Sequence, residues 1–407
     1  MPKDYSPFTP GQPVPIEFFI GRLAEVSRLT DHAARAAAGR LQVAFLSGER
    51  GIGKSSLASF VRIITERDHG ALGLHAFLGG VSSMEEMARR VFDRLLKESL
   101  GKSWEGRVTD FFGNHIKRVG LFGVSVEFGA PEKDLRRMVH DFAPALRNLM
   151  ERLKDVKKAV FLVLDDINGL ASSLEFANWI KSLVDEIATA REPLPLCLVL
   201  VGLEERRQSL VQLQPSLARV FDLIEIKAWS NSETRDFFRS AFSTVNVAVD
   251  DENLTFLARF AGGLPVLAHE IGDATFKFVR DNRIDDDVAL KGVITAAEII
   301  GRKHLEPQVF QEIRSDRYRT ILRKIAKKPF QIRFKRAELR EHLTSDEQDV
   351  LHNFLRRMVK LDVIHSDPEG GRGAYRFTNE LHYLYFLLEG DARGDADVEP
   401  ERMSEGD

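Results

Sequence analysis

The sequence predicts an α/β protein in which a central parallel β-sheet carries helices on both faces. Residues 43–46, 159–164 and 196–201 are apolar runs with the length of buried strands. The first run leads into a glycine-rich loop and a helical pattern, and the second ends in the carboxylates of Asp165 and Asp166. Strands buried on both faces read as continuous apolar runs, which is typical of parallel sheets covered by helices.

The composition sets the broad class. A chain of 407 residues is long enough for two or three domains, and its net charge of −3 gives no general attraction to nucleic acid or membranes. The single cysteine, Cys197, lies inside the third apolar run and is interpreted as a small buried hydrophobe. One cysteine forms no disulfide within the chain, and no apolar run reaches the roughly 18 residues of a membrane helix. With no signal peptide recognised, we expect a cytoplasmic protein without a membrane partner.

The glycine-rich loop carries the most specific motif. Gly48-Glu-Arg-Gly-Ile-Gly-Lys-Ser55 fits G-x-x-x-x-G-K-[ST] at every fixed position, between an apolar strand and a helix. Glycines let the backbone wrap a phosphate with its N–H groups, to which the helix N-terminus adds positive potential. Lys54 is expected to reach the β- and γ-phosphates, and the Ser55 hydroxyl to ligate Mg²⁺. The loop therefore predicts nucleoside triphosphate binding by Gly48, Glu49, Arg50, Gly51, Ile52, Gly53, Lys54, Ser55 and Ser56.

The two acids after the second apolar run predict the hydrolytic half of the site. In a parallel sheet, a strand places such acids at its carboxyl end, beside the phosphate loop. Asp165 is expected to hold the Mg²⁺ shell, and Asp166 to orient or activate the attacking water. The predicted site therefore uses Ser55 and Asp165 for the metal, and Lys54 and Asp166 for catalysis.

Further elements follow from periodicity. Residues 1–17, with five prolines, predict an extended lead-in. Residues 74–78 predict a second strand, 84–100 a helix, 118–128 a β-hairpin inserted before the next core helix, and 134–153 that helix. A capping box at Ser230 and Glu233 opens a helical region over residues 230–305.

The C-terminal part combines a basic run with a helix-and-hairpin pattern. Residues 314–340 hold eleven Arg or Lys residues against two acids. Helices are predicted from Tyr318, over 336–343 and from Ser345 to Leu361, with strands near 363–365 and 375–377 joined by a turn-rich wing. This pattern predicts a winged helix-turn-helix, and the basic run suits phosphate contacts. The third helix, however, opens with Asp346, Glu347 and Asp349, which would repel DNA. Docking on the ATPase or on a partner protein is therefore ranked slightly above DNA binding. Residues 389–407 are acidic and predict a disordered tail.

These motifs resemble those of STAND and origin-recognition-like AAA+ ATPases of the archaeal type, many of which end in a winged helix. Residues 18–22, Phe-Phe-Ile-Gly-Arg, match the box that opens their nucleotide-binding domain, and Gly262-Gly-Leu-Pro265 resembles their Gly-Leu-Pro motif. The resemblance implies that Gly21 and Arg22 border the adenine and that Pro265 abuts the adenine or the inner phosphate. It also puts Arg219 at the arginine-finger position, although a solvated arginine at a helix end is nearly as good an interpretation.

The chain departs from standard AAA+ proteins at three places, and the first and third departures favour the STAND branch. Asp166 stands where most AAA+ proteins have Glu, and its shorter reach leaves the hydrolysis rate open. Gly202 and Leu203 follow the third strand where a polar sensor residue is usual, which leaves Glu204 or Arg206 to substitute. Val266 stands where a second sensor arginine is usual, with His269 one turn on.

The predicted organisation is a lead-in (1–17), a P-loop nucleotide-binding domain (18–229), a helical lid (230–305), a winged helix-turn-helix (306–388) and a tail (389–407). The predicted function is an ATPase that binds ATP and Mg²⁺, forms ADP and phosphate, and acts as a nucleotide-dependent switch or assembly factor. Self-association or a protein partner is expected, and duplex DNA is a possible ligand of residues 314–340 and the winged helix. Two alternatives stay open: a DNA-binding regulator with ATP as a structural ligand, and a scaffold for an effector in defence or transposition.

Overall fold

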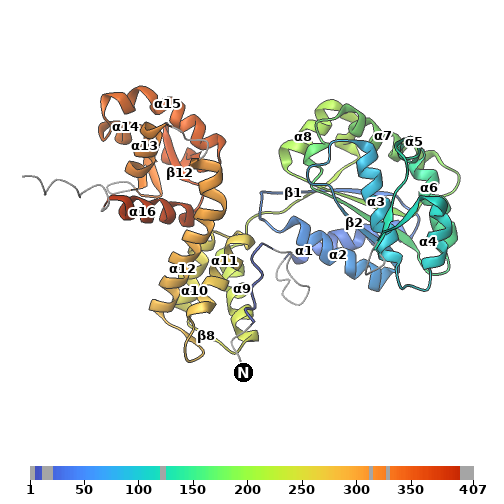
Figure 1. Ribbon diagram of the computed structural model, residues 1–407, viewed down its shortest axis with the longest axis horizontal. Coiled ribbons are helices and arrows are strands. Elements are labelled where there is room, and N and C mark those ends of the chain that lie inside the picture. Colours follow the sequence, from blue (N-terminus) through green and yellow to red (C-terminus); the bar gives the residue numbers. More distant parts are fainter. Residues whose placement is uncertain (1–4, 12–21, 120–124, 311–314, 327–330, 395–407) are drawn as a thin grey trace, which may run out of the picture. The chain divides into compact units, whose positions relative to one another are not determined.

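The computed structural model describes residues 5–11, 22–119, 125–310, 315–326 and 331–394. The chain divides into two compact units, shown in Figure 1. We call residues 13–227 the sheet unit, and residues 1–12 together with 228–407 the helical unit. The chain therefore starts in the helical unit, builds the sheet unit and then returns.

A five-stranded parallel sheet forms the centre of the sheet unit, in the order β2-β5-β6-β1-β7. The strands are β1 (Gln42–Ser47), β2 (Ala71–Phe77), β5 (Ala159–Asp165), β6 (Leu196–Val201) and β7 (Asp222–Glu225). The three apolar runs of the sequence are β1, β5 and β6, which lie side by side in the middle of the sheet. The predicted α/β class is confirmed, with the second strand starting earlier than residue 74.

Helices supply the crossovers between the parallel strands, as this topology requires. They are α1 (Leu23–Ala37), α2 (Lys54–His69), α3 (Met84–Ser99), α4 (Glu105–Phe112), α5 (Glu132–His140), α6 (Phe142–Leu153), α7 (Leu174–Thr189) and α8 (Glu204–Leu213). Short 3-10 turns occur at Gly113–His115, Ile167–Gly169 and Pro215–Arg219.

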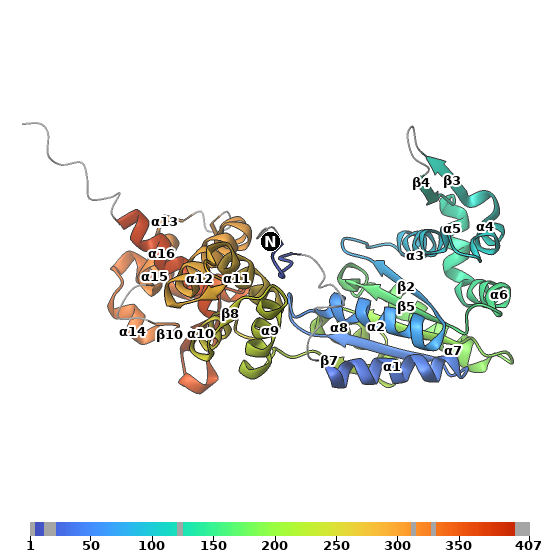
Figure 2. The same ribbon diagram turned by 90° about the horizontal axis from the view of Figure 1, so that it is seen from below.

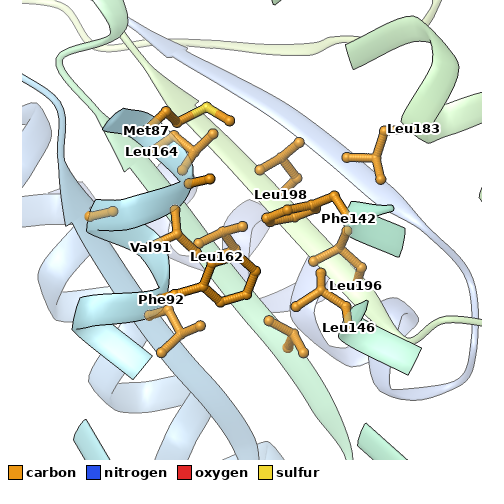
Figure 3. Close-up of a cluster of buried hydrophobic side chains, with 14 of the residues drawn as sticks. Met87, Val91, Phe92, Phe142, Leu146, Leu162, Leu164, Leu183, Leu196 and Leu198 are labelled. Carbon is orange, nitrogen blue, oxygen red and sulfur yellow. The ribbon is translucent and has the colours of Figure 1, made fainter. Parts of the chain in front are cut away.

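The two faces of the sheet are covered by different helices. Figure 3 shows one face, where side chains of α3, α6 and α7 surround Leu162, Leu164, Leu196 and Leu198 of β5 and β6. Alternate residues of a strand point to opposite faces, so Phe161, Val163, Cys197 and Val199 point to the other one. That face is covered by α1 and α2, which Figure 2 shows on the side of the strands opposite α3.

The helix predicted over residues 134–153 is wrong as a single element, because it is broken at Asp141 into α5 and α6. Pro144 lies in the first turn of α6. It has no N–H to donate to the carbonyl of His140, and its ring would clash with that carbonyl in a continuous helix. The predicted hairpin before α5 is confirmed by antiparallel pairing of β3 (Ile116–Val119) with β4 (Ser125–Phe128), while its turn lies outside the described residues.

The helical unit begins, after residue 228, with α9 (Asn231–Thr244), α10 (Asp251–Ala261), α11 (Pro265–Phe278) and α12 (Asp286–Ile300). The predicted capping box at Ser230 and Glu233 is present at the start of α9. Two short strands, β8 (Ala248–Val249) and β9 (Arg283–Ile284), pair in parallel, and a π-helical stretch spans Gly301–Phe310.

The N-terminal segment, residues 5–11, is part of this unit and is not only a lead-in. Phe8 is 3% exposed, and its ring lies against Phe237, Phe242 and His269. A Cβ atom at Gly272 would come within 2.3 Å of this ring, so the glycine in α11 makes room for it. The backbone N–H of Thr9 donates to Nδ1 of His269 at 3.1 Å. We call Phe8, Phe237, Phe238, Phe242 and His269 the aromatic cluster.

The rest of the helical unit combines short helices with a small sheet. Its elements are α13 (Asp316–Ala326), β10 (Arg333–Lys335), α14 (Arg336–Glu341), α15 (Ser345–Lys360), β11 (Ile364–Ser366), β12 (Ala374–Phe377) and α16 (Glu380–Gly394). The sheet is antiparallel, in the order β10-β12-β11. The sequence did not predict β10, and α16 extends into the stretch 389–407 that the composition assigns to a tail. Along the described chain, no helix is both long and apolar enough to cross a membrane.

Candidate functional site

The glycine-rich loop, Gly48–Gly53, connects β1 to α2. Gly48, Gly51 and Gly53 have φ values of 152°, 75° and 94°, which side chains rarely tolerate. A Cβ atom at Gly48 would also lie 2.7 Å from the carbonyl oxygen of Ile226. The glycines of the motif are therefore required by the backbone path, and this path leaves the first N–H groups of α2 at the loop.

Lys54 is the first residue of α2, and its side chain turns back into the loop. Its Nζ donates to the carbonyl oxygens of Gly48 and Glu49, each at 2.7 Å. Burial lowers the pKa of Lys54, while the negative charges of Asp165 and Asp166 act in the opposite direction. The predicted catalytic cation therefore lies inside the loop, within electrostatic reach of both predicted acids. Ser55 and Ser56 follow in the first turn of the same helix.

Asp165 ends β5 and is buried, at 2% exposed. The strand order places β6 between β5 and β1, so one strand separates this acid from the loop. The Nε2 atom of His75, on β2, lies 2.8 Å from Oδ2 of Asp165. Sequence reasoning missed His75, and its signal was a histidine inside the otherwise apolar stretch 74–78. The pairing partner becomes visible only once β2 is placed next to β5.

Asp166 differs from its neighbour in both exposure and backbone. It is exposed, and its φ of 58° and ψ of 55° are in the left-handed region, which is uncommon outside glycine. The Nδ2 atom of Asn168 donates to Oδ1 of Asp166, and Oδ1 of Asn168 accepts from the N–H of Leu203 at 3.4 Å. Asn168 therefore connects the loop after β5 with the loop after β6. Sequence reasoning did not single it out.

The residues proposed to replace the missing polar sensor lie at the start of α8. Glu204 accepts from Arg207 Nε at 3.0 Å, and this bond is the main reason why the pKa of Glu204 is lowered. Gly202 lies close to the side chains of Ile167 and Asn168. A Cβ atom built at Gly202 would lie 3.3 Å from the side chain of Ile167 and 3.6 Å from that of Asn168. Gly202 therefore packs against the residues that follow β5.

Arg22 lies beside the loop, whereas Gly21 is outside the described residues. Arg22 precedes α1 with a φ of 63°, and its Nη2 donates to the carbonyl of Ile52 at 3.5 Å. Its Nη1 also lies 3.7 Å from Glu25. The structure thus brings one of the two box residues to the glycine loop.

Arg219 is not part of this group, and Pro265 belongs to the other unit. Arg219 ends the 3-10 turn before β7 and is exposed, with no ion pair to any described residue. Pro265 belongs to the helical unit, where it is buried at the first position of α11. The turn before it packs on Trp229, since a Cβ at Gly263 would lie 2.3 Å from the Trp229 carbonyl. His269, one turn further on, is engaged in the aromatic cluster.

A metal ion would need ligands from outside the protein here. Among the described residues, no group of three or more His, Cys, Asp or Glu side chains is placed to hold one. Mg²⁺ in phosphate-transferring sites takes only one or two protein oxygens and completes its shell with phosphates and water. A hydroxyl at Ser55 and a carboxylate at Asp165 fit that donor set. No described residue donates to Oδ1 of Asp165, which is left for such a role.

Comparison with known proteins agrees with this geometry. Residues 19–199 match the family model of the AAA ATPase domain, and no curated protein matches the chain. The ORC2 protein of Aeropyrum pernix, solved in ADPNP–ADP complexes, aligns with a TM-score of 0.59 and 15% identity over 98% of this chain and 97% of that one. A Walker-type ATPase of Pyrococcus abyssi aligns with a TM-score of 0.56 and 16% identity over 94% of this chain and 99% of that one. The fold is therefore shared along almost the whole chain.

Proposed function

We propose that the loop from Gly48 to Ser55 binds Mg-ATP and that the sheet unit hydrolyses it to ADP and phosphate, since residues 19–199 match the family model of the AAA ATPase domain. One observation carries the proposal. The ammonium of Lys54 lies inside the loop, where the negative charges of Asp165 and Asp166 raise its pKa against the effect of burial. These acids come from a distant part of the sequence. A cation, two acids and the N-terminus of a helix at one sheet edge are the parts that phosphoryl transfer needs.

The residues would divide the work as follows. Backbone N–H groups of the loop and of α2 bind the phosphates, and Lys54 exchanges its two carbonyl partners for phosphate oxygens. Bound Mg²⁺ would supply further positive charge to the β- and γ-phosphates, held by Ser55 and Asp165. Asp166 orients the attacking water, and Asn168 fixes the direction of that carboxylate. Gly21, Arg22 and Pro265 are proposed to line the adenine side.

The test of nucleotide binding is Lys54→Ala. We expect turnover to fall about 10²–10³-fold, since one charged donor to the transferring group is lost. A fluorescent ATP analogue measures binding and phosphate release measures turnover. Lys97→Ala, at a half-exposed lysine of α3, is the matched control. Unchanged binding and turnover in Lys54→Ala would overturn the assignment.

A pair of variants distinguishes the role of Asp165 from that of Asp166. Asp166→Asn should keep Mg-ATP bound but slow hydrolysis by about 10²–10⁴-fold, whereas Asp165→Asn should also weaken the metal. Hydrolysis at the wild-type rate in Asp166→Asn would move the role of base to Glu204.

Arg219 is proposed to act on the nucleotide of a second copy of the chain. Its exposed position before β7, without an ion pair among the described residues, leaves it available for this. An arginine supplied in trans is worth roughly 10³–10⁵ in rate in the best cases. Arg219→Ala and Lys54→Ala proteins should each be inactive, and mixing them should restore turnover. Normal turnover by Arg219→Ala alone would rule the role out.

We further propose that nucleotide state changes the arrangement of the two units, which makes the protein a switch or an assembly factor. The support is that Pro265 lies in one unit and the glycine loop in the other. Burial raises the pKa of the only thiol, Cys197, so dyes attached through introduced cysteines would be site-specific. Glu151→Cys and Arg302→Cys, both at side chains that are 70% exposed, place one dye on each unit. Equal energy transfer with ATP and with ADP would contradict the switch.

DNA binding is a second candidate function, through a winged helix formed by α13, α14, α15 and the β11–β12 hairpin. Two of the three acids at the start of α15 pair with α13: Lys324 donates to Glu347 at 2.7 Å, and Arg317 pairs with Asp346 at 3.4 Å. Glu347 is also buried, so it does not face a phosphate. The exposed side of α15 carries His352, Asn353 and Arg356 together with the third acid, Asp349. Asparagine and arginine are common base readers.

The DNA proposal is tested by anisotropy with a labelled duplex. If six to ten phosphates are contacted, affinity should fall about 10³–10⁵-fold between 50 and 200 mM salt. Arg356→Ala should weaken binding, and replacing Lys335 and Arg336 together should flatten the salt dependence. Arg302→Ala is the exposed control. No binding at low salt would favour a protein partner for this surface.

A further inference from the structure

The edge strand β2 contributes a side chain to the acid at the end of β5. His75 and Asp165 are both nearly inaccessible, with side chains 2% and 3% exposed, and Nε2 of His75 lies 2.8 Å from Oδ2 of Asp165. His75 lies opposite Val163 in the strand register, and Phe77 lies opposite Asp165. The ring of His75 is therefore directed along the strands, toward the carboxyl end of the sheet.

Two further contacts fix this pair. The His75 ring stacks on Phe77, with ring centroids 4.3 Å apart and planes 21° apart, which restrains its rotation. The N–H of Leu78 donates to the carbonyl oxygen of Asp165 at 2.7 Å, which holds the backbone of the acid against the end of β2. A carboxylate only accepts hydrogen bonds, so Nε2 is the protonated nitrogen of His75.

The hydrogen bond affects the two oxygens of Asp165 differently. Oδ2 is taken by His75, while Oδ1 accepts no hydrogen bond from the described residues. Asp165 ends β5, and only β6 separates this strand from β1, which leads into the loop where phosphates would bind. A carboxylate held by one oxygen presents the other in a single direction.

We propose that His75 is a positioning residue that orients Asp165, so that this acid offers one oxygen to the Mg²⁺ of the bound nucleotide. The inference rests on the proposed function, because it needs a nucleotide-bound metal. Partners that orient metal-binding side chains from behind are typically worth about 10–100-fold in metal affinity or activity. His75 itself touches neither nucleotide nor metal.

The test compares His75→Leu with His75→Gln. Leucine keeps an apolar volume without a donor, whereas the glutamine amide places an N–H close to the position of Nε2. The measurement is binding of a fluorescent ATP analogue, first in EDTA and then across a titration with MgCl₂. We expect wild-type affinity in EDTA for both variants. The Mg²⁺ concentration for half-maximal enhancement should rise about 10–100-fold in His75→Leu and return to within a few-fold in His75→Gln.

The controls separate this role from a purely structural one. His140→Leu removes an exposed histidine that also pairs with an acid, Asp141, and it should change nothing. If His75→Leu does not fold, His75→Asn replaces it, since its amide is one methylene too short to reach Oδ2. The inference would be overturned if His75→Leu, or His75→Asn in its place, kept the wild-type Mg²⁺ requirement. It would also be overturned if His75→Gln did not restore that requirement. Failure of the wild-type protein to bind nucleotide at any Mg²⁺ concentration would instead overturn the proposed function.

Discussion

Each unit contains a nearly inaccessible histidine, and the two lie in different environments. In the sheet unit, His75 faces the carboxylate of Asp165. In the helical unit, His269 is surrounded by the rings of Phe8 and Phe237, and its Nδ1 accepts from the backbone N–H of Thr9. Burial lowers the pKa of His269 to about 4, so this ring is neutral at pH 7. The same side chain therefore pairs with an acid in one unit and fills an apolar cluster in the other.

The largest expected effect that tests this contrast is that of Phe8→Ala. Removing a buried phenylalanine ring typically costs about 3–5 kcal/mol of stability, part of it from the cavity left behind. The loss should fall on the helical unit, because Phe8 contacts only residues of that unit in the aromatic cluster. Urea unfolding measures the loss, and nucleotide binding in EDTA should stay at the wild-type level.

Tyr5→Ala is the matched control, because Tyr5 belongs to the same segment but is 87% exposed. We expect a change within about 0.5 kcal/mol. Equal destabilisation by the two variants would mean that the segment is not held by its phenylalanine.

A pH series sharpens the comparison through His269. Its pKa is about 4 in the fold and about 6.5 in the unfolded chain, so between these values the unfolded state binds more protons. The contribution of His269 is fully present above pH 6.5 and is lost as the pH falls toward 4, on the order of 3 kcal/mol in total. The unfolding free energy should therefore drop more steeply on acidification in the wild type than in His269→Asn. Asparagine keeps an acceptor for Thr9 but does not titrate, so parallel pH curves would refute the assignment.

The smallest expected effect concerns strain in the sheet unit. Asp166 has a left-handed backbone, which costs non-glycine residues of order 1 kcal/mol or more. Asp166→Gly should therefore stabilise the sheet unit by about 1 kcal/mol while hydrolysis is lost. Asp166→Asn keeps the side-chain volume and the strain, so it should lose hydrolysis without gaining stability. Equal melting temperatures for the two variants would show that no strain is stored there.

Residues adjacent in the sequence were predictable, and residues joined by the fold were not. The glycine loop, Lys54 and the two acids are contiguous patterns in which residue type follows from the backbone path or the chemistry. The pairing of His75 with Asp165 depends on β2 lying next to β5, and the sequence carries no direct sign of which strands are neighbours. Pro144 indicates the break between α5 and α6, but the predicted single helix ran through it. The burial of Phe8 was not predicted, because its proline-rich stretch was interpreted only as an extended lead-in.

The split of the helical unit between the two ends of the chain also bears on how the protein is made. The hydrogen bond from Thr9 to His269 joins residues 260 positions apart. At about 5–20 residues per second, a ribosome needs on the order of 10–50 s to cover that separation. During this interval Phe8 has left the ribosome while its partners in α9 and α11 do not yet exist. The contiguous sheet unit can fold meanwhile, so it is complete before the helical unit can close around the first residues of the chain.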